Sequence, residues 1–188
     1  MKSPGPVTVS LETVVKKGAM TMHMNFSHDK KYSYETFECD VVKNLIMETQ
    51  GEIYNLAYKM NFDMSWFSEQ YLKSVFCEKE MDAIYSKFQT EFPEACMEEL
   101  LSEWDNKKIA IVCRKEDAID AYTSPTRIGQ IYRYLFYELC LPSKELQHIL
   151  PYSEIANYDI EFDTLEIENI VSFIMEDYQD EIQKFHEK

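Results

Sequence analysis

Glycine and proline are scarce in this chain, with 4 glycines and 6 prolines among 188 residues. So few turn-forming residues argue against an all-β sandwich or barrel, in which tight turns join many short strands. Apolar residues make up 45% of the chain and include 11 Phe and 13 Tyr, which is enough to form a core. The composition indicates a folded, mainly helical protein with one domain, or two small ones that share a core.

Basic residues are also in short supply, with 19 Lys and Arg against 34 Asp and Glu and a formal net charge of -15. A field of that sign repels DNA, RNA and anionic membranes, so we expect no direct nucleic-acid binding and no membrane binding. The charge suits a basic protein partner or the imitation of a nucleic-acid surface. A well-solvated acidic surface without a partner explains the same charge equally well.

Paired cysteines and long apolar runs are missing. The five cysteines are odd in number and form no C-x-x-C pair, and most of them lie beside apolar residues, as in "SVFCEK" and "IAIVCR". They argue against a disulfide scaffold or a cysteine zinc site and predict buried free thiols. No apolar run approaches the ~20 residues of a membrane helix, and the N-terminus lacks the apolar stretch of a signal peptide. We therefore expect a cytoplasmic protein.

Catalytic motifs are absent as well. The sequence contains no G-x-S-x-G, P-loop, G-x-G-x-x-G or H-E-x-x-H motif. His23 and His28 lie near three methionines, but their spacing matches no regular set of metal ligands. Carboxylate pairs are so frequent that none stands out as a general acid or base. We expect no metal and no cofactor, and these absences favour a binding protein over an enzyme.

From residue 33 onward, apolar residues recur at helical spacing and predict an all-α fold, an irregular bundle of about seven or eight helices. The predicted helices cover about 34–60, 63–76, 93–104, 124–140, 143–150, 152–160 and 164–186. Met81, Ile84, Tyr85 and Phe88 either continue the second helix or form a separate one. Gly51 is expected to weaken the first helix. Candidate cap or first-turn residues are Asp63, Ser65, Pro93, Ser124, Pro125, and Asp163 with Glu166 as a capping box.

Residues 1–32 have a different character. The alternating stretches "PVTVSLETVV" and "AMTMHMNF" flank "KKG", which predicts either a short β-hairpin or an N-terminal arm. Residues 33–188 would form a single helical domain, and a break near 105–110 could divide it into two halves. "IAIVC" (Ile109–Cys113) could be a short buried strand, and its candidate partner would then be "VTVSL".

One stretch, "YTSPTRIGQIYRYL", carries two of the three arginines of the chain. Its apolar residues surround the helix almost completely, which is typical of a central, buried helix. Arg133 would then need a carboxylate partner, and a structural ion pair is one interpretation. The other is a pocket for a phosphate or carboxylate formed by Arg127, Tyr132 and Arg133. Arg127 lies in the first helical turn, where the helix dipole disfavours a cation, and the two arginines face about 120° apart.

The segments "LAYKMNFD", "FSEQYLKSVFCEKEMD" and "IGQIYRYLFYELCLPSKEL" resemble small acidic helical proteins of gut Firmicutes, in which a Y-R-Y helix is followed by a short S-K-E helix. The resemblance covers about two-thirds of the chain. Some of those proteins are encoded in toxin–antitoxin or phage-defence settings without a settled activity. The resemblance implies no catalytic residues and favours a binding or neutralising protein.

These observations lead to a first hypothesis: a non-enzymatic acidic module that binds a basic protein, as an antitoxin, an immunity protein or a phage-encoded inhibitor does. Association would be steered by charge and completed by burial of aromatic anchors. The candidate anchors, which could equally be core residues, are Trp66, Phe67, Trp104 and Tyr178. The alternatives are a small anionic-ligand or nucleotide-binding protein that uses the Arg/Tyr pocket, and a nucleic-acid mimic. The sequence leaves the oligomeric state open.

Overall fold

The computed structural model describes residues 15–16, 19–20, 40–115 and 122–186. Near the N-terminus, β1 (Val15–Lys16) and β2 (Ala19–Met20) pair antiparallel, with Val15 opposite Met20. The remainder of the predicted hairpin or arm, including "VTVSL", lies outside the described residues. The described residues from Asp40 onward belong to one compact unit.

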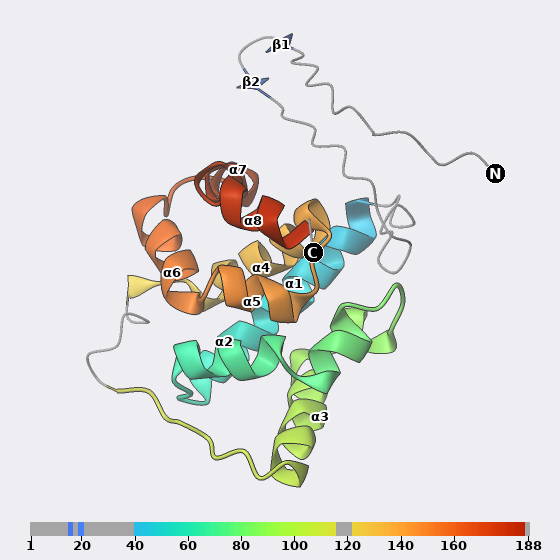
Figure 1. The fold of residues 1–188 in the computed structure, drawn as a ribbon. Coiled ribbons are helices and arrows are strands. Elements are labelled where there is room, and N and C mark those ends of the chain that lie inside the picture. The colour runs from blue at the N-terminus through green and yellow to red at the C-terminus, as the bar shows by residue number, and fades with distance from the viewer. Residues whose placement is uncertain (1–14, 17–18, 21–39, 116–121, 187–188) are drawn as a thin grey trace, which may run out of the picture. The chain divides into compact units, whose positions relative to one another are not determined.

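That unit is mainly helical, as predicted (Figure 1). Its longer helices are α1 (Asp40–Lys59), α2 (Met64–Leu72), α3 (Pro93–Asn106), α4 (Pro125–Leu139), α5 (Ser143–Ile149), α6 (Tyr152–Glu161), α7 (Ile167–Asp177) and α8 (Gln179–His186). A one-turn π-helix, η2 (Cys77–Met81), and a 3-10 helix, η3 (Lys87–Thr90), lie between α2 and α3. Within the described ranges, no helix is both long and apolar enough to cross a membrane.

Several helix starts follow the predicted signals. The Asp63 side chain accepts a hydrogen bond from the backbone N–H of Trp66 at 2.9 Å, and α2 begins at the next residue. Ser124 caps α4 in the same way through the N–H of Arg127. Proline occupies the first position of both α3 and α4, where its missing N–H costs nothing. These caps are local, which explains why the sequence reveals them.

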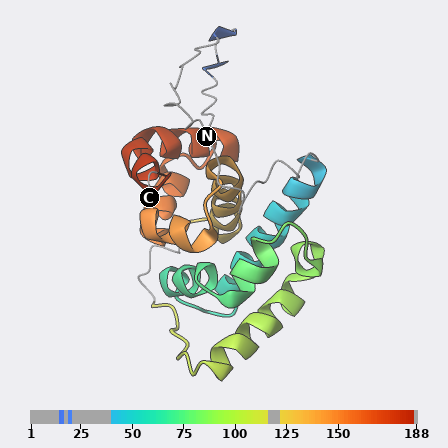
Figure 2. The same cartoon turned by 45° about the vertical axis from the view of Figure 1, so that its right-hand side comes forward.

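Gly51, which the sequence suggests as a weak point, lies within α1. The helix runs through it without a break, and α4 crosses α1 at this point. A Cβ on Gly51 would lie 2.9 Å from the carbonyl oxygen of Thr126, and one on Gly129 would lie 2.8 Å from that of Gln50. The two glycines therefore permit a close backbone approach between the two central helices. Figures 1 and 2 show α1 against α4, with α2 and α3 beside α1, α5–α7 beside α4, and α8 against α7.

The prediction of one final helix over 164–186 is wrong. The structure has two helices, α7 and α8, which are separated at Tyr178. The capping box at Asp163 and Glu166 is also wrong, because α7 begins at Ile167 and no side chain caps it. Tyr178 ends α7 with its backbone N–H bonded to Ile174, and its side chain turns to α6. The break therefore coincides with a tertiary contact, which local spacing does not reveal.

The stretch between α2 and α3 contains less helix than its apolar residues suggested. Ile84 and Tyr85 lie in an irregular stretch between η2 and η3, with exposed fractions of 63% and 86%. Glu103 of α3 instead organises the start of this region, since its carboxylate accepts the backbone N–H groups of Val75 and Phe76 at 2.9 and 2.8 Å. Apolar periodicity over so short a stretch was not evidence of a buried face.

Ile109–Cys113 is neither a helix nor part of a regular sheet. It runs as an extended segment and makes one isolated antiparallel bridge, between Cys113 and Phe62. Its partner is therefore the link between α1 and α2. Cys113 is exposed, against the prediction of a buried thiol, whereas Cys77 and Cys96 are buried and free as predicted. The thiol of Cys113 faces solvent because its apolar neighbours lie at the surface too.

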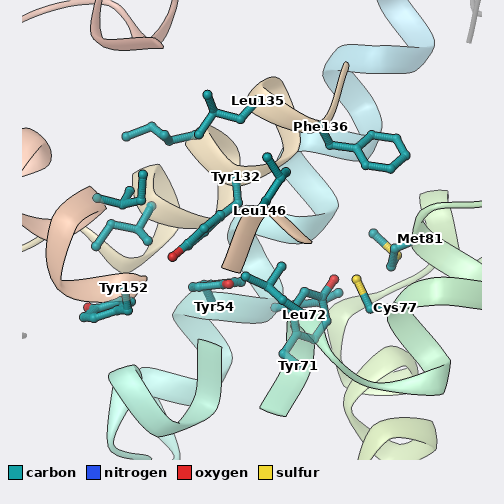
Figure 3. Packing of buried hydrophobic residues seen from close by; sticks show 14 of the residues in the cluster. Tyr54, Tyr71, Leu72, Cys77, Met81, Tyr132, Leu135, Phe136, Leu146 and Tyr152 are labelled. Carbon is teal, nitrogen blue, oxygen red and sulfur yellow. The ribbon is translucent and has the colours of Figure 1, made fainter. Parts of the chain in front are cut away.

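Aromatic side chains fill the centre of the core. The ring of Tyr54 makes edge contacts with Phe67 at 5.3 Å and with Tyr71 at 5.6 Å between centroids. Figure 3 shows Tyr54, Tyr71 and Tyr132 converging where α1, α2 and α4 meet. The Tyr54 hydroxyl is paired with that of Ser68 at 2.9 Å, so its buried polar end is satisfied. One continuous apolar cluster extends from α1 to α8.

Candidate functional site

Arg133 lies at the centre of the core and is fully buried. Its Nε and Nη2 donate to the side-chain oxygen of Gln50 at 2.9 and 2.6 Å. Nη1 donates to the carbonyl oxygen of Met81 and to Asp82 Oδ1, at 2.9 and 3.1 Å. The guanidinium also lies over the ring of Phe136, 4.4 Å from its centroid. The guanidinium therefore finds internal partners for all three nitrogens.

Asp82 is the carboxylate that the buried arginine requires. Besides Arg133, it accepts the backbone N–H of Ser143 at 2.8 Å and the hydroxyl of the same residue at 2.6 Å. Burial raises the pKa of the Asp82 carboxyl, and the charge of Arg133 and the Ser143 bonds partly offset that rise. The network joins η2 to the start of α5 and, through Arg133 and Gln50, to α4 and α1. A buried charge pair with this many hydrogen bonds is a structural element.

Cys77 is the nucleophile nearest to this network, and it is not activated. Its sulfur is 3.9 Å from Asp82 Oδ1 and 4.0 Å from Arg133 Nη2. Burial, reinforced by the nearby carboxylate of Asp82, raises the pKa of the Cys77 thiol far above its ordinary value. A reactive cysteine needs a lowered pKa and access to solvent. The pair of Cys77 and Arg133 therefore does not support covalent chemistry.

Arg127 occupies the first turn of α4, where the helix dipole disfavours a cation, and its side chain reaches negatively charged and carbonyl oxygens elsewhere. Its Nε forms an ion pair with Asp159 Oδ1 at 3.0 Å. Its Nη2 donates to the carbonyl oxygens of Phe162 and Leu165 at 3.1 and 3.2 Å, and Nη1 donates to that of Asp163. These carbonyls follow the C-terminus of α6, where the helix dipole favours a cation. The arginine is at an unfavourable end of its own helix and at a favourable end of another.

The three residues of the predicted ligand pocket have separate partners. Arg127 binds the turn after α6, whereas Arg133 binds η2 and α1. Tyr132 is buried, and its hydroxyl donates to the carbonyl oxygen of Leu150 at 2.8 Å. Each of the three side chains therefore has its own internal oxygen partners. Within the described residues there is also no group of three or more His, Cys, Asp or Glu that could hold a metal ion.

The four predicted partner anchors lie in two environments. Phe67 and Trp104 are buried in the core, with exposed fractions of 0% and 1%. Trp66 is half-buried and makes an edge contact with the ring of Trp104 at 5.1 Å. Tyr178 is half-buried at the junction of α7 and α8 and donates its hydroxyl to Glu154 Oε2 at 3.0 Å. Of the four, Tyr178 lies beside the most acidic part of the chain.

Residues 151–183, which we call the acidic segment, span α6, α7 and the start of α8. They contain ten Asp and Glu and no Lys or Arg. Asp159 is buried against Arg127, and eight of the others are exposed. The acidic segment therefore has a formal charge of -10 in a chain whose net charge is -15, and Arg127 pairs with one of its ten acids. The signal was visible in the sequence as a run without a basic residue, but carboxylate pairs elsewhere obscured it.

A row of stacked aromatic rings, formed by Tyr158, Phe162 and Phe173, reaches the surface of the same segment at Phe173. Phe162 stacks on Phe173 at 5.1 Å and on Tyr158 at 6.2 Å between centroids. Phe173 is 41% exposed, and Ile160, also in the acidic segment, is 40% exposed. The Tyr158 hydroxyl donates to Asp177, so α6 is tied to the end of α7. The segment thus combines a stacked aromatic row with carboxylates, a composition suited to guanidinium and ammonium groups.

Comparison with known proteins gives no relative for this chain. No family model matches it, and neither a curated protein nor a solved structure matches.

Proposed function

We propose that the protein is a non-enzymatic binding module whose acidic segment docks on a basic surface of another protein. The observation that carries this proposal is the charge of residues 151–183, ten carboxylates without a basic residue, of which eight are exposed. Such a field accelerates encounter with a basic partner and penalises acidic ones. A protein of this kind would mask a basic toxin or enzyme, as antitoxins, immunity proteins and phage-encoded inhibitors do.

The aromatic row of Tyr158, Phe162 and Phe173 would supply the short-range contacts of such an interface. Charge alone steers association, whereas stable binding requires desolvated contacts at the centre of an interface. Phe162 and Phe173 offer such a centre, and an arginine side chain can stack on an aromatic ring while it pairs with a carboxylate. Tyr178 is the one sequence-predicted anchor that lies beside this row. The free, buried thiols of Cys77 and Cys96 fit a reducing compartment such as the cytoplasm.

The Arg/Tyr ligand pocket is less well supported. Arg127 and Arg133 are both held by internal oxygen atoms, and a bound anion would have to displace those contacts. Displacing a buried ion pair that already has good geometry is costly. We therefore favour the binding module over the small-ligand protein.

A matched pair of triple variants tests the proposal. One variant neutralises three exposed acids of the acidic segment, by Glu161→Gln, Glu168→Gln and Glu176→Gln, and the control neutralises three exposed acids of α3, by Glu94→Gln, Glu98→Gln and Glu99→Gln. The two have the same net charge, and each loses one acid from the first turn of a helix. A difference between them therefore reports on location and not on total charge.

The probe is an amphipathic helical peptide of leucine, lysine and arginine, whose binding is followed by fluorescence anisotropy at increasing salt. At about 0.5 kcal/mol for each exposed ion pair, the first variant should bind about tenfold more weakly than wild type. The α3 variant should bind like wild type, and the difference should shrink as salt screens the charges. Equal weakening in both variants would mean that bulk charge alone attracts the peptide, and the proposal would be wrong.

A further inference from the structure

A second candidate surface lies on the segment Ile109–Lys115, which follows α3 and which we call the basic edge. The segment is extended in Figures 1 and 2 and is fixed to the link between α1 and α2. The N–H of Asp63 donates to the carbonyl oxygen of Val112, and the N–H of Arg114 donates to that of Asn61, both at 2.9 Å. The basic edge is therefore a short strand that is paired along one side.

The opposite side of this strand has free backbone groups. The two hydrogen bonds flank the bridge between Cys113 and Phe62, and in an antiparallel pair of this kind the bridged residues direct their own N–H and C=O groups away from each other. By the two-residue period of a strand, the groups of Ile111 point the same way as those of Cys113. No backbone hydrogen bond joins Ile111 or Cys113 to another residue in the described ranges.

The side chains along the basic edge are exposed and apolar. Ile111 is 48% exposed and Val112 is 40% exposed. Arg114 anchors the segment, because its guanidinium lies 3.8 Å from the centroid of the Tyr58 ring. An anchored strand with a free apolar edge is a template for pairing with another chain.

The local charge selects what can pair there. Residues 106–115 contain Lys107, Lys108, Arg114 and Lys115 and no acid, in a chain whose net charge is -15. Lys107 is paired with Glu103 at 2.6 Å, whereas Lys108 and Lys115 are exposed and form no ion pair with the described residues. A second copy of this chain would bring like charges together at the same edge, which disfavours self-pairing. An acidic extended segment has the complementary charge.

We propose that the basic edge binds an acidic, extended segment of a partner protein as an added β-strand. The N–H and C=O groups of Ile111 and Cys113 form the new ladder. Lys108 and Lys115 pair with acidic side chains of the incoming strand, and Ile111 and Val112 contact its apolar side chains. This surface is distinct from the acidic segment and selects the opposite charge, so the inference does not depend on the proposed function.

The test uses the full chain and a blocked peptide of alternating glutamate and valine, with hydrogen exchange of the Ile111 and Cys113 amides as the readout. The peptide should bind saturably and slow the exchange of both amides. The same peptide N-methylated at alternate residues should lose at least about tenfold in affinity, since it lacks the donors of the ladder. This comparison needs no variant of the protein and stays informative if a variant fails to fold.

Two variants at one position provide the matched control. Cys113→Pro removes the outward N–H and places a ring at the free edge, where proline is tolerated in an edge strand, while the internal bonds of Val112 and Arg114 remain. Cys113→Ala keeps the N–H. The proline variant should bind the peptide about tenfold more weakly, and the alanine variant like wild type. Neutralising Lys108 and Lys115 together should weaken binding several-fold and reduce its salt dependence.

Three results would overturn the inference. The first is equal binding to Cys113→Pro and Cys113→Ala. The second is equal protection of the Ile111 and Cys113 amides by a lysine–valine peptide, which would remove the role of charge. The third is protection of the same amides that depends on protein concentration without any peptide, which would assign the edge to self-association.

Discussion

Replacing Arg133 with methionine should reveal how much stability depends on the buried polar network. Methionine keeps an unbranched apolar chain beside Phe136, so the change removes mainly polar contacts. Asp82 would lose its cation while it remains buried, and the carbonyl oxygen of Met81 would keep only its longer bond from Gln89 Nε2, at 3.4 Å. Removing one partner of a buried ion pair costs about 3–5 kcal/mol. Because domains of this size are stable by about 5–15 kcal/mol, the variant should unfold at much lower urea concentration.

A double-mutant cycle with Asp82→Asn separates the ion pair from packing. Asparagine is neutral and keeps an oxygen that can accept from Ser143. If the cost of Arg133→Met comes mainly from the uncompensated carboxylate, the double variant should be more stable than the sum of the two single changes predicts, by at least about 1 kcal/mol. Urea unfolding followed by far-UV circular dichroism measures all four proteins. Additive losses, or a loss below about 1 kcal/mol for Arg133→Met, would refute the reasoning.

The pH dependence of the same variant provides an independent check. Burial raises the pKa of Asp82 above the ordinary value of 3.8, and Arg133 partly lowers it. Without Arg133 the native pKa rises further. A carboxyl with a raised native pKa stabilises the fold fully below its unfolded pKa and loses that contribution as the pH rises through the native pKa. The destabilisation by Arg133→Met should therefore be smaller at mildly acidic pH than at neutral pH, and the opposite trend would contradict the assignment.

Three further changes have defined outcomes. Gly129→Ala should cost about 1–3 kcal/mol of unfolding free energy in urea, although alanine favours helices, because its Cβ would lie 2.8 Å from a carbonyl oxygen of α1. Arg127→Ala should cost about 2 kcal/mol by leaving Asp159 without its cation, and phosphate should not raise the melting temperature of the wild type; an unchanged stability would restore the ligand-pocket hypothesis. A thiol reagent should label Cys113 in the native protein and Cys77 only after unfolding, which peptide mass spectrometry can follow, and equal labelling would contradict the burial.

Local signals in the sequence predicted local structure well. Asp63, Ser124 and the prolines at the starts of α3 and α4 act within one helical turn, so their effect does not depend on the rest of the chain. The features that these local signals missed depend on distant residues. Gly51 allows a close backbone approach together with Gly129, which lies on another helix. The helix α7 ends at Tyr178, whose side chain bonds to α6. No periodicity within a single helix encodes such contacts.

In the candidate sites, too, the sequence predicted local requirements but not the distant residues that meet them. The sequence predicted that a buried Arg133 needs a carboxylate, because that requirement is a property of the charge itself. It did not identify Asp82, because 34 acids were available and the choice depends on how η2 packs against α4. The free side of the basic edge was also hidden, since it follows from a bridge to Phe62 that residue spacing does not reveal.

The positions of the basic residues explain why the acidic segment is left uncompensated. Arg133 is enclosed by the core, Arg127 serves the turn after α6, and Arg114 is stacked on a tyrosine ring. The 16 lysines could still have neutralised the acidic segment. If the 19 basic residues were spread evenly along the chain, about three would lie between residues 151 and 183, but none does. Exposed carboxylates without counter-charges repel one another and lower stability. That cost is easier to explain if a basic surface relieves it, which is the condition that a docking partner would satisfy.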